Sequence, residues 1–230
     1  MNYYFAPLEG ITGYLYRNTY EKHFGGVSKY FSPFIATNQH YGMQNKEKRD
    51  VLPANNKEYY LVPQIMSNKA DQFVDMAKKL KDLGYQTGCG IMVGTPGQTA
   101  KVIAKDMKFM EEFQPAMIGV GPFLPHKETP FKDEKKGSAE LTLFLLALCR
   151  ILFPKVLLPA TTALGTVDSD GRKQGVLAGC NVIMPNLSPL SVRKKYMLYD
   201  EKAGTDMTAA EGIALLKKQM EEIGYEVVIG

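Results

Sequence analysis

Cysteine is scarce in this chain: its 230 residues contain three, Cys89, Cys149 and Cys180, which lie far apart in the sequence. An odd number of isolated cysteines in apolar surroundings offers no disulfide framework, so we expect reduced and buried thiols. Zinc and iron–sulfur centres need closely spaced thiolates or imidazoles, and the sequence has no such cluster. The sequence therefore predicts a cytoplasmic protein without a metal site.

Long apolar runs and a strong excess of one charge are also missing. No uninterrupted apolar stretch reaches the roughly 18 residues that a membrane-spanning helix needs, and the opening sequence MNYYFAPLEG lacks the basic and apolar pattern of an export signal. The 28 basic and 24 acidic residues are spread along the whole chain. We therefore expect no membrane partner, and nothing in the charge pattern indicates a nucleic-acid partner.

What the sequence does contain is a regular alternation of short apolar strands and amphipathic helices. The expected strands are 3–6, 29–35, 59–65, 90–93, 117–123, 156–161 and 181–184, and the expected helices are 12–23, 46–52, 70–83, 100–113, 141–152, 171–178 and 208–223. This order predicts an α/β fold with a parallel sheet, in the form of one (β/α)8 TIM-barrel-like domain over residues 1–230. Seven strands are expected on these grounds, and Glu226–Ile229 is the candidate for an eighth.

Closure of this sheet matters because a closed barrel leaves no strand edge exposed. If only seven strands form, an open edge is left, and self-association through that edge becomes a further expectation. The sequence does not decide between closure with seven strands and closure with eight.

The helix expected at 70–83 shows the periodicity most clearly. Its apolar residues recur at helical spacing, so we expect Phe73, Ala77 and Leu80 to face the core. Asn68 is the expected N-cap, and Gly84 is expected to end the helix.

Ligands of parallel α/β proteins bind at the carboxyl ends of the strands. Polar side chains follow the expected strands at Gln64, Gln98, Thr161, Thr162 and Asn186. Neutral donors and acceptors that converge there suit a heterocycle or a carboxylate, so we expect a small-molecule or anion ligand at this face of the barrel. No Ser/His/Asp order or pair of acids stands out, and no catalytic residue is predicted.

The first 85 residues contain the motifs APLEGIT, PFI and VPQI, in this order and at expected strand ends. This segment resembles the start of tRNA-dihydrouridine synthases, a family of flavin-dependent barrel enzymes. The resemblance implies that Ala6, Pro7, Leu8 and Gln64 line the FMN ring. The Gly-Cys-Pro catalytic loop of that family does not follow after Tyr85.

The remaining residues, 86–230, contain YQTGCGIMVGTPGQT, MIGVGPFLPHKETPF and CNVIMPNLSPLSVRKKY. They resemble the C-terminal half of HydE, the radical-SAM maturase of iron-only hydrogenase. The resemblance implies that Gly90 and Met92 lie near the adenine of SAM and that Thr161 and Thr162 belong to an anion-binding cavity. The CxxxCxxC cluster motif of that family is not in the sequence.

We therefore interpret the chain as a chimeric barrel with a seam near residue 85, engineered or a natural mosaic, in which neither parental activity is intact. Two alternatives stay open. One is an FMN-binding oxidoreductase of dihydrouridine-synthase type with weak flavin affinity, and the other is residual binding of SAM or a small anion by the HydE-like half. No resident cofactor and no iron–sulfur cluster are expected.

Overall fold

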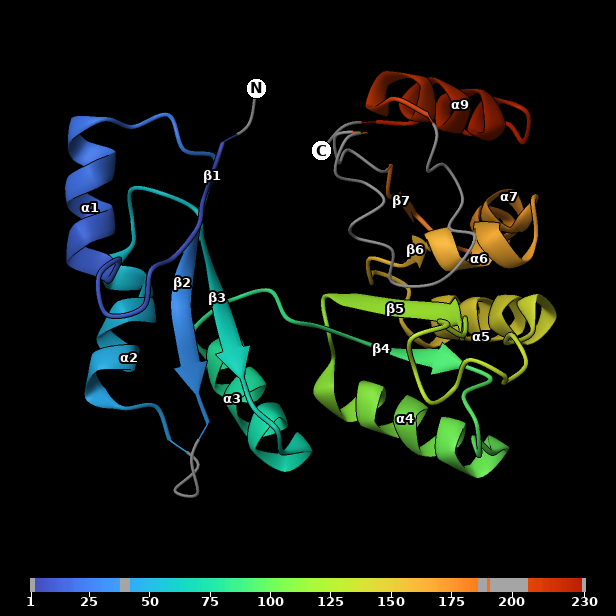
Figure 1. Ribbon diagram of the computed structural model, residues 1–230, viewed down its shortest axis with the longest axis horizontal. Helices are drawn as coiled ribbons and strands as arrows, with labels where there is room; N and C mark the ends of the chain where they lie inside the picture. The colour runs from blue at the N-terminus through green and yellow to red at the C-terminus, as the bar shows by residue number, and fades with distance from the viewer. Residues whose placement is uncertain (1–2, 38–41, 186–189, 191–206, 229–230) are drawn as a thin grey trace. The chain divides into compact units, whose positions relative to one another are not determined.

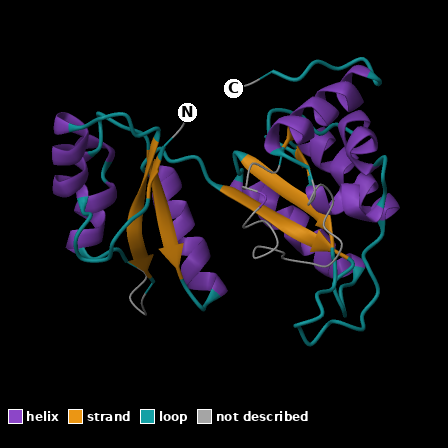
Figure 2. Ribbon diagram, turned by 45° about the horizontal axis from the view of Figure 1, so that its top comes forward, coloured by secondary structure: helices purple, strands orange, loops and turns teal. Residues whose placement is uncertain are grey.

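The computed structural model describes residues 3–37, 42–185, 190 and 207–228 (Figure 1). The chain forms two compact units, which we call unit 1 (Met1–Thr87) and unit 2 (Gly88–Gly230). Helices alternate with strands in both units, and the paired strands are parallel (Figure 2). The predicted α/β class is therefore confirmed.

Unit 1 contains one three-stranded sheet in the order β1-β2-β3. Its strands and helices are β1 (Tyr4–Phe5), α1 (Tyr14–His23), β2 (Lys29–Ala36), α2 (Asn45–Val51), the short 3-10 helix η1 (Pro53–Asn55), β3 (Leu61–Met66) and α3 (Ala70–Asp82). The register of β2 against β3 shifts between Phe31 and Phe34. Pro33 lies in this interval and cannot donate to the ladder, which accounts for an irregularity at this position.

The core of unit 1 forms where the sheet meets α2 and α3. Its buried members are Tyr30, Ile35, Val51, Leu61, Met76 and Leu80. Ala77 and Leu80 are buried as the periodicity predicts, but the prediction was wrong for Phe73, which is 44% exposed. Gln72 and Met76 are buried instead. The helix is thus turned toward Met76, whose flexible side chain adapts to the space in the core.

The two ends of α3 differ from each other in how far they follow the prediction. The N-cap position is Lys69 rather than Asn68, and no side chain caps the helix there. At the other end Gly84 has a φ of 92°, and Tyr85 N donates to Leu80 O over 3.1 Å. Glycine adopts this left-handed conformation without steric cost, so Gly84 ends the helix as predicted.

Unit 2 contains two short parallel sheets, one of β4 and β5 and one of β6 and β7. Its elements are β4 (Gly88–Val93), α4 (Ala100–Phe113), β5 (Met117–Pro122), α5 (Ala139–Leu152), β6 (Pro159–Ala160), α6 (Thr162–Val167), α7 (Gly171–Leu177), β7 (Val182–Ile183) and α9 (Ala209–Glu221). A single bridge between Met117 and Leu157 links the two pairs of strands.

The core of unit 2 is apolar almost throughout. Leu146, Leu158 and Leu164 are fully buried at its centre. Ser138 begins α5 by accepting a hydrogen bond from Leu141 N over 3.1 Å. Although α5 is strongly apolar, neither it nor any other helix in the described residues is long and apolar enough to cross a membrane.

The strands do not form the closed barrel that the sequence predicts, because the described strands make one sheet of three and two sheets of two. The predicted eighth strand is wrong for residues 226–228, which are not in a strand, and Val228 is 80% exposed. Ile229 lies outside the described residues. The single barrel domain, its seam near residue 85 and self-association through an open edge stay predictions.

The sequence also missed α6, which replaces the end of the strand expected at 156–161. The strand β6 is only two residues long. It stops because Thr161 Oγ1 accepts a hydrogen bond from Leu164 N over 3.3 Å and begins a helix instead. A helix of six residues carries too little periodicity to be recognised in the sequence.

Candidate functional site

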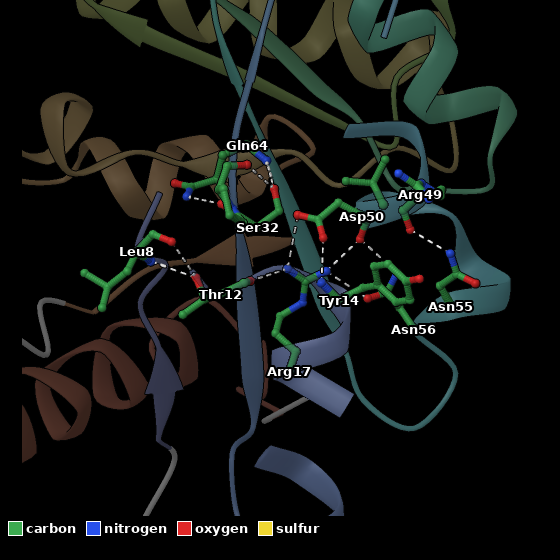
Figure 3. A network of polar contacts seen from close by, with 12 residues as sticks. Leu8, Thr12, Tyr14, Arg17, Ser32, Arg49, Asp50, Asn55, Asn56 and Gln64 are labelled. Carbon is green, nitrogen blue, oxygen red and sulfur yellow. Dashed lines mark hydrogen bonds and ion pairs between the residues drawn. The ribbon is translucent and has the colours of Figure 1, made fainter. Parts of the chain in front are cut away.

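The first predicted site residues follow β1. Leu8 N donates to Thr12 Oγ1 over 2.7 Å, and the same hydroxyl donates to Leu8 O over 3.1 Å (Figure 3). Thr12 is buried, whereas the Leu8 side chain is 60% exposed. Ala6 is exposed and Pro7 is half-buried. This tight turn therefore presents Leu8 to solvent at the carboxyl end of the first strand.

Gln64 lies in β3, opposite Phe34 of β2. Its Nε2 donates to Ser32 O over 2.8 Å, and its backbone N donates to Ser32 Oγ over 3.1 Å (Figure 3). These bonds satisfy polar groups of β2 where the register shifts. The amide of Gln64 therefore stabilises the irregular part of the sheet, and its Oε1 atom has no partner among the described residues.

The sequence analysis missed the most highly connected side chain of unit 1, Arg17 on α1, which is fully buried. Its Nη1 donates to Thr12 O over 2.8 Å, and its Nη2 donates to Asp50 O over 2.6 Å. Nη2 also donates to Asn56 Oδ1 over 3.0 Å, and Nε donates to the Tyr59 hydroxyl over 3.2 Å. Nη1 lies 3.6 Å from Asp50 Oδ2 (Figure 3). The guanidinium thus donates four hydrogen bonds and also lies beside a carboxylate.

The groups around Arg17 satisfy one another as well. Asp50 Oδ1 accepts a hydrogen bond from Tyr14 N, and Tyr59 donates its hydroxyl hydrogen to Asn56 Oδ1 over 2.7 Å. Burial raises the pKa of Tyr59, and the charge of Arg17 only partly opposes this shift, so the phenol stays protonated. A buried cation that donates four hydrogen bonds and has a carboxylate beside it holds α1 to the segment after α2.

One feature of the sequence could have identified Arg17. It lies three residues from Tyr14 and three from Tyr20, so the three side chains share a face of α1. A lone cation on an aromatic helix face has to bury its charge among hydrogen-bond acceptors or leave the core.

In unit 2 the predicted strand-end residue Gln98 closes the loop after β4. Its Oε1 accepts from Gly94 N over 2.7 Å, and its Nε2 donates to Met92 O over 2.9 Å. Met92 itself is 60% exposed. The loop after β5 contacts the end of β4, because Phe123 N donates to Val93 O over 2.8 Å. The carboxyl ends of β4 and β5 are thereby joined.

Gly90 lies opposite Gly119 of β5. A Cβ atom at Gly90 would lie 2.2 Å from Gly119 O, which no side chain can tolerate. The close approach of two strands is therefore enough to require this glycine. Gly88, Gly90 and Met92 lie on the exposed face of β4.

Thr161 and Thr162 are half-buried at the start of α6. A Cβ atom added to Gly121 would lie 2.9 Å from Thr161 Oγ1, so Thr161 lies beside the end of β5. Unit 2 thus brings together the strand ends that hold Met92, Gln98 and Thr161. Asn186 lies outside the described residues.

Two of the three cysteines of unit 2, Cys149 and Cys180, are buried as expected, whereas Cys89 is only half-buried. Burial raises the pKa of Cys89 and Cys149 to about 11 and that of Cys180 to about 12. The thiolate is the form that attacks electrophiles and binds metals, so these thiols are unreactive at neutral pH. In the part of the chain that the structure describes, no three His, Cys, Asp or Glu side chains are grouped so that they could hold a metal ion.

No protein-family model matches the chain. It is 46% identical over 145 residues to the FeFe hydrogenase maturase subunit HydE of Thermotoga maritima, a match that covers 63% of this chain and 42% of HydE. It is 30% identical over 149 residues to the 3-methylornithine synthase of Methanosarcina acetivorans, covering 64% of this chain and 40% of that enzyme. Against the 3-methylornithine synthase of Methanosarcina barkeri it is 29% identical over 130 residues, or 56% of this chain and 36% of that enzyme.

Part of this chain is homologous to HydE. The chain spans about two fifths of the length of the curated relatives that it matches. No dihydrouridine synthase is among these relatives, so the comparisons do not support the resemblance of residues 1–85, the chimera or FMN binding. The cofactor roles expected for the strand-end residues of both units stay predictions.

Proposed function

We propose that the chain is a fusion of two α/β segments that carries neither parental activity. The segment up to about residue 85 is of dihydrouridine-synthase type, and the rest is a HydE-like half-barrel. The division of the chain between Thr87 and Gly88, close to the seam of the two resemblances, is the observation that carries this proposal. A fusion between whole βα units leaves most of the packing within each part unchanged, because such units pack mainly on their neighbours.

The extent of the match with HydE supports the same seam. It spans 145 residues, which is also the length of the segment 86–230, and it covers 42% of HydE. The strands β4 to β7 of unit 2 would supply half of an eight-stranded barrel. The N-terminal segment would add its three strands, β1 to β3, which makes seven in all.

The proposed loss of both activities follows from missing residues. Cys89 follows the segment that resembles the synthases, but the next residue is Gly90 rather than the proline of the synthase loop. Burial also raises the pKa of the Cys89 thiol to about 11, so it is a poor acid at neutral pH. The 230 residues contain no CxxxCxxC motif to hold the cluster that cleaves SAM in the radical-SAM family.

The test uses the purified chain in two activity assays. We expect no 5′-deoxyadenosine from SAM with dithionite after iron and sulfide reconstitution, and no dihydrouridine from unmodified tRNA with FMN and NADPH. Authentic HydE and an authentic dihydrouridine synthase are the positive controls. Product above the level of a buffer blank in either assay contradicts the proposal.

Residual binding of SAM by unit 2 is a second candidate, favoured by the exposed Met92 at a HydE-like strand end. Calorimetric titration with SAM tests it. Met92→Ala should weaken binding, whereas Met66→Ala, which removes a similarly exposed methionine from β3 of unit 1, should not. Absence of saturable binding, or an equal loss in the two variants, contradicts this candidate.

A further inference from the structure

Unit 1 contains a cleft of about 280 Å³ between the β1–α1 turn, the start of α1 and α2. Ile11, Leu15 and Tyr16 line it on one side, and Lys46, Arg49 and Asp50 of α2 line it on the other. Its size approaches that of small-molecule sites, which begin at roughly 300 Å³. The cleft lies wholly within unit 1, so binding there does not depend on the fusion proposed above.

The two acidic side chains of α2 already have partners. Asp50 accepts a hydrogen bond from Tyr14 N and lies beside the buried Arg17. The carboxylate of Glu47 accepts hydrogen bonds from Ala36 N of β2 over 3.1 Å and from Gln44 N over 2.8 Å, and it does not line the cleft. Of the charged residues that line the cleft, Lys46 and Arg49 are cations, and the one acid, Asp50, is paired with Arg17.

Lys46 and Arg49 are exposed, and no ion pair joins either of them to an acid among the described residues. Arg49 uses only Nε in a hydrogen bond, to Asn45 O over 3.3 Å. The two cations are three residues apart on α2 and so share a helix face. The cleft therefore has an excess of positive charge at one wall.

The opposite wall is apolar. Ile11 and Leu15 are both exposed although they are large hydrophobic residues. The turn that carries Ile11 is held by two hydrogen bonds to Leu8 O, from Ile11 N over 3.1 Å and from Thr12 N over 3.0 Å. An ordered apolar wall that faces two unpaired cations is complementary to a molecule with an anionic end and an apolar body.

We propose that this cleft binds a small molecule whose phosphate or carboxylate group is held by Lys46 and Arg49 and whose apolar or aromatic body packs on Ile11 and Leu15. The planar guanidinium of Arg49 can bind two oxygens of such a group at once, and Lys46 adds a point charge.

The test is calorimetric titration of the full chain with phenyl phosphate, inorganic phosphate and phenol. Phenyl phosphate should bind saturably and more tightly than either fragment, because only it uses both walls. The double variant Lys46→Ala/Arg49→Ala should weaken it about fivefold to tenfold, the range expected for two exposed charge contacts. Lys48→Ala removes an exposed cation of the same helix outside the cleft and should change the affinity less than about twofold.

Leu15→Ala tests the apolar wall separately and should reduce the affinity for phenyl phosphate but not for inorganic phosphate. Near-UV circular dichroism of the tyrosines shows whether each variant keeps the fold of unit 1. The proposal is overturned if phenyl phosphate shows no saturable binding, if phenol binds as tightly, or if Lys48→Ala weakens binding as much as the double variant.

Discussion

Unit 1 and unit 2 bury different kinds of side chain. Among the described residues, the buried polar and charged side chains of unit 1 are Thr12, Arg17, Ser32, Asp50, Asn56 and Gln72, whereas Thr142 is the one in unit 2. The apolar cluster of unit 1 has six buried members, and that of unit 2 has sixteen. Unit 1 thus depends on matched hydrogen bonds, and unit 2 depends on apolar contact.

This difference changes how each unit should respond to mutation. A buried polar group that loses its partner keeps the full cost of its desolvation, so a single change in unit 1 can have a large effect. In unit 2 the stabilising free energy is spread over many apolar contacts. The positions most sensitive to mutation are those where two backbones are in contact.

The composition of the two units makes them separately observable. Of the thirteen tyrosines only Tyr196, Tyr199 and Tyr225 come after residue 87, and the chain has no tryptophan, so tyrosine emission reports mainly on unit 1. All three cysteines come after residue 87, so thiol reactivity reports on unit 2.

The largest effect is expected from Arg17→Met, which removes the buried cation beside the Asp50 carboxylate and the four hydrogen bonds that its guanidinium donates. Removing one member of a buried ion pair typically costs about 3–5 kcal/mol. The midpoint of the tyrosine transition in urea should fall, while thiol protection in unit 2 should change little. Lys22→Met, at an exposed cation of the same helix, is the control. An unchanged tyrosine midpoint in Arg17→Met would show that the network is not what stabilises unit 1.

The next effect is expected in unit 2 from Gly90→Ala, because the new Cβ would lie 2.2 Å from Gly119 O. Forcing the two strands apart should cost about 2–3 kcal/mol, the upper part of the range for overpacking. This loss is measured from the urea concentration at which the thiols of unit 2 become reactive. Gly119→Ala is the matched control on the partner strand, where the new Cβ would lie 4.0 Å from Cys89 O, an ordinary van der Waals contact. Equal losses in the two variants would refute the close-approach explanation.

Alkaline pH should weaken unit 2 before unit 1. Burial raises the pKa of Cys149 to about 11 and that of Cys180 to about 12, from a usual value of 9.0. The two buried, protonated thiols stabilise unit 2, and this contribution to its free energy of unfolding is complete below pH 9. It is lost as the pH rises toward 11 and 12, because the thiols of the unfolded chain ionise first. At pH 10 the loss is about 1.4 kcal/mol for each thiol.

Tyr85 provides the comparison in unit 1, because burial raises its pKa to about 12 from a usual value of 10.0. Its unfolded form ionises one unit later than a cysteine, so the corresponding loss at pH 10 is only about 0.4 kcal/mol. Urea titrations at pH 7 and pH 10 should therefore show the larger decrease in the thiol transition. A larger decrease in the urea midpoint of the tyrosine transition would contradict the prediction that alkaline pH weakens unit 2 before unit 1.

The smallest effect is expected from Ser138→Ala, which removes the hydroxyl that accepts a hydrogen bond from Leu141 N. Loss of such a cap costs about 1 kcal/mol. Lys69→Ala at the N-cap position of α3 in unit 1 should cost almost nothing, because no side chain caps that helix. The urea midpoint of the thiol transition measures the effect of Ser138→Ala, and that of the tyrosine transition measures the effect of Lys69→Ala. A loss of stability in Lys69→Ala as large as that in Ser138→Ala would contradict this prediction.

Local signals were sufficient for the order and type of most elements. The helix predicted at 100–113 coincides with α4, and Gly84 ends α3 through its left-handed conformation. These features depend on residues a few positions apart, which is the range that periodicity and capping describe. The same signals failed for α6, which is too short to show a period, and for Phe73, where packing decided which side of α3 is buried.

The candidate site was predictable only as a set of strand ends. The sequence identified Gln64, Gln98 and Thr161 as polar residues at these positions. It did not indicate that Gln64 bonds to Ser32 across the irregular part of the sheet, or that Gln98 closes its own loop.

The sequence by itself determined the alternation of strands and helices, their parallel α/β arrangement and the end of α3 at Gly84, because all of these depend on neighbouring residues. Only the tertiary structure decided that Arg17 is the buried centre of unit 1 and that Gly90 has no room for a side chain. Arg17 bonds to Asp50 and Tyr59, which are 33 and 42 residues away. Gly90 depends on the carbonyl of Gly119 on another strand. Contacts between residues so far apart exist only after the chain has folded, because the local pattern of the sequence says nothing about which distant groups will meet.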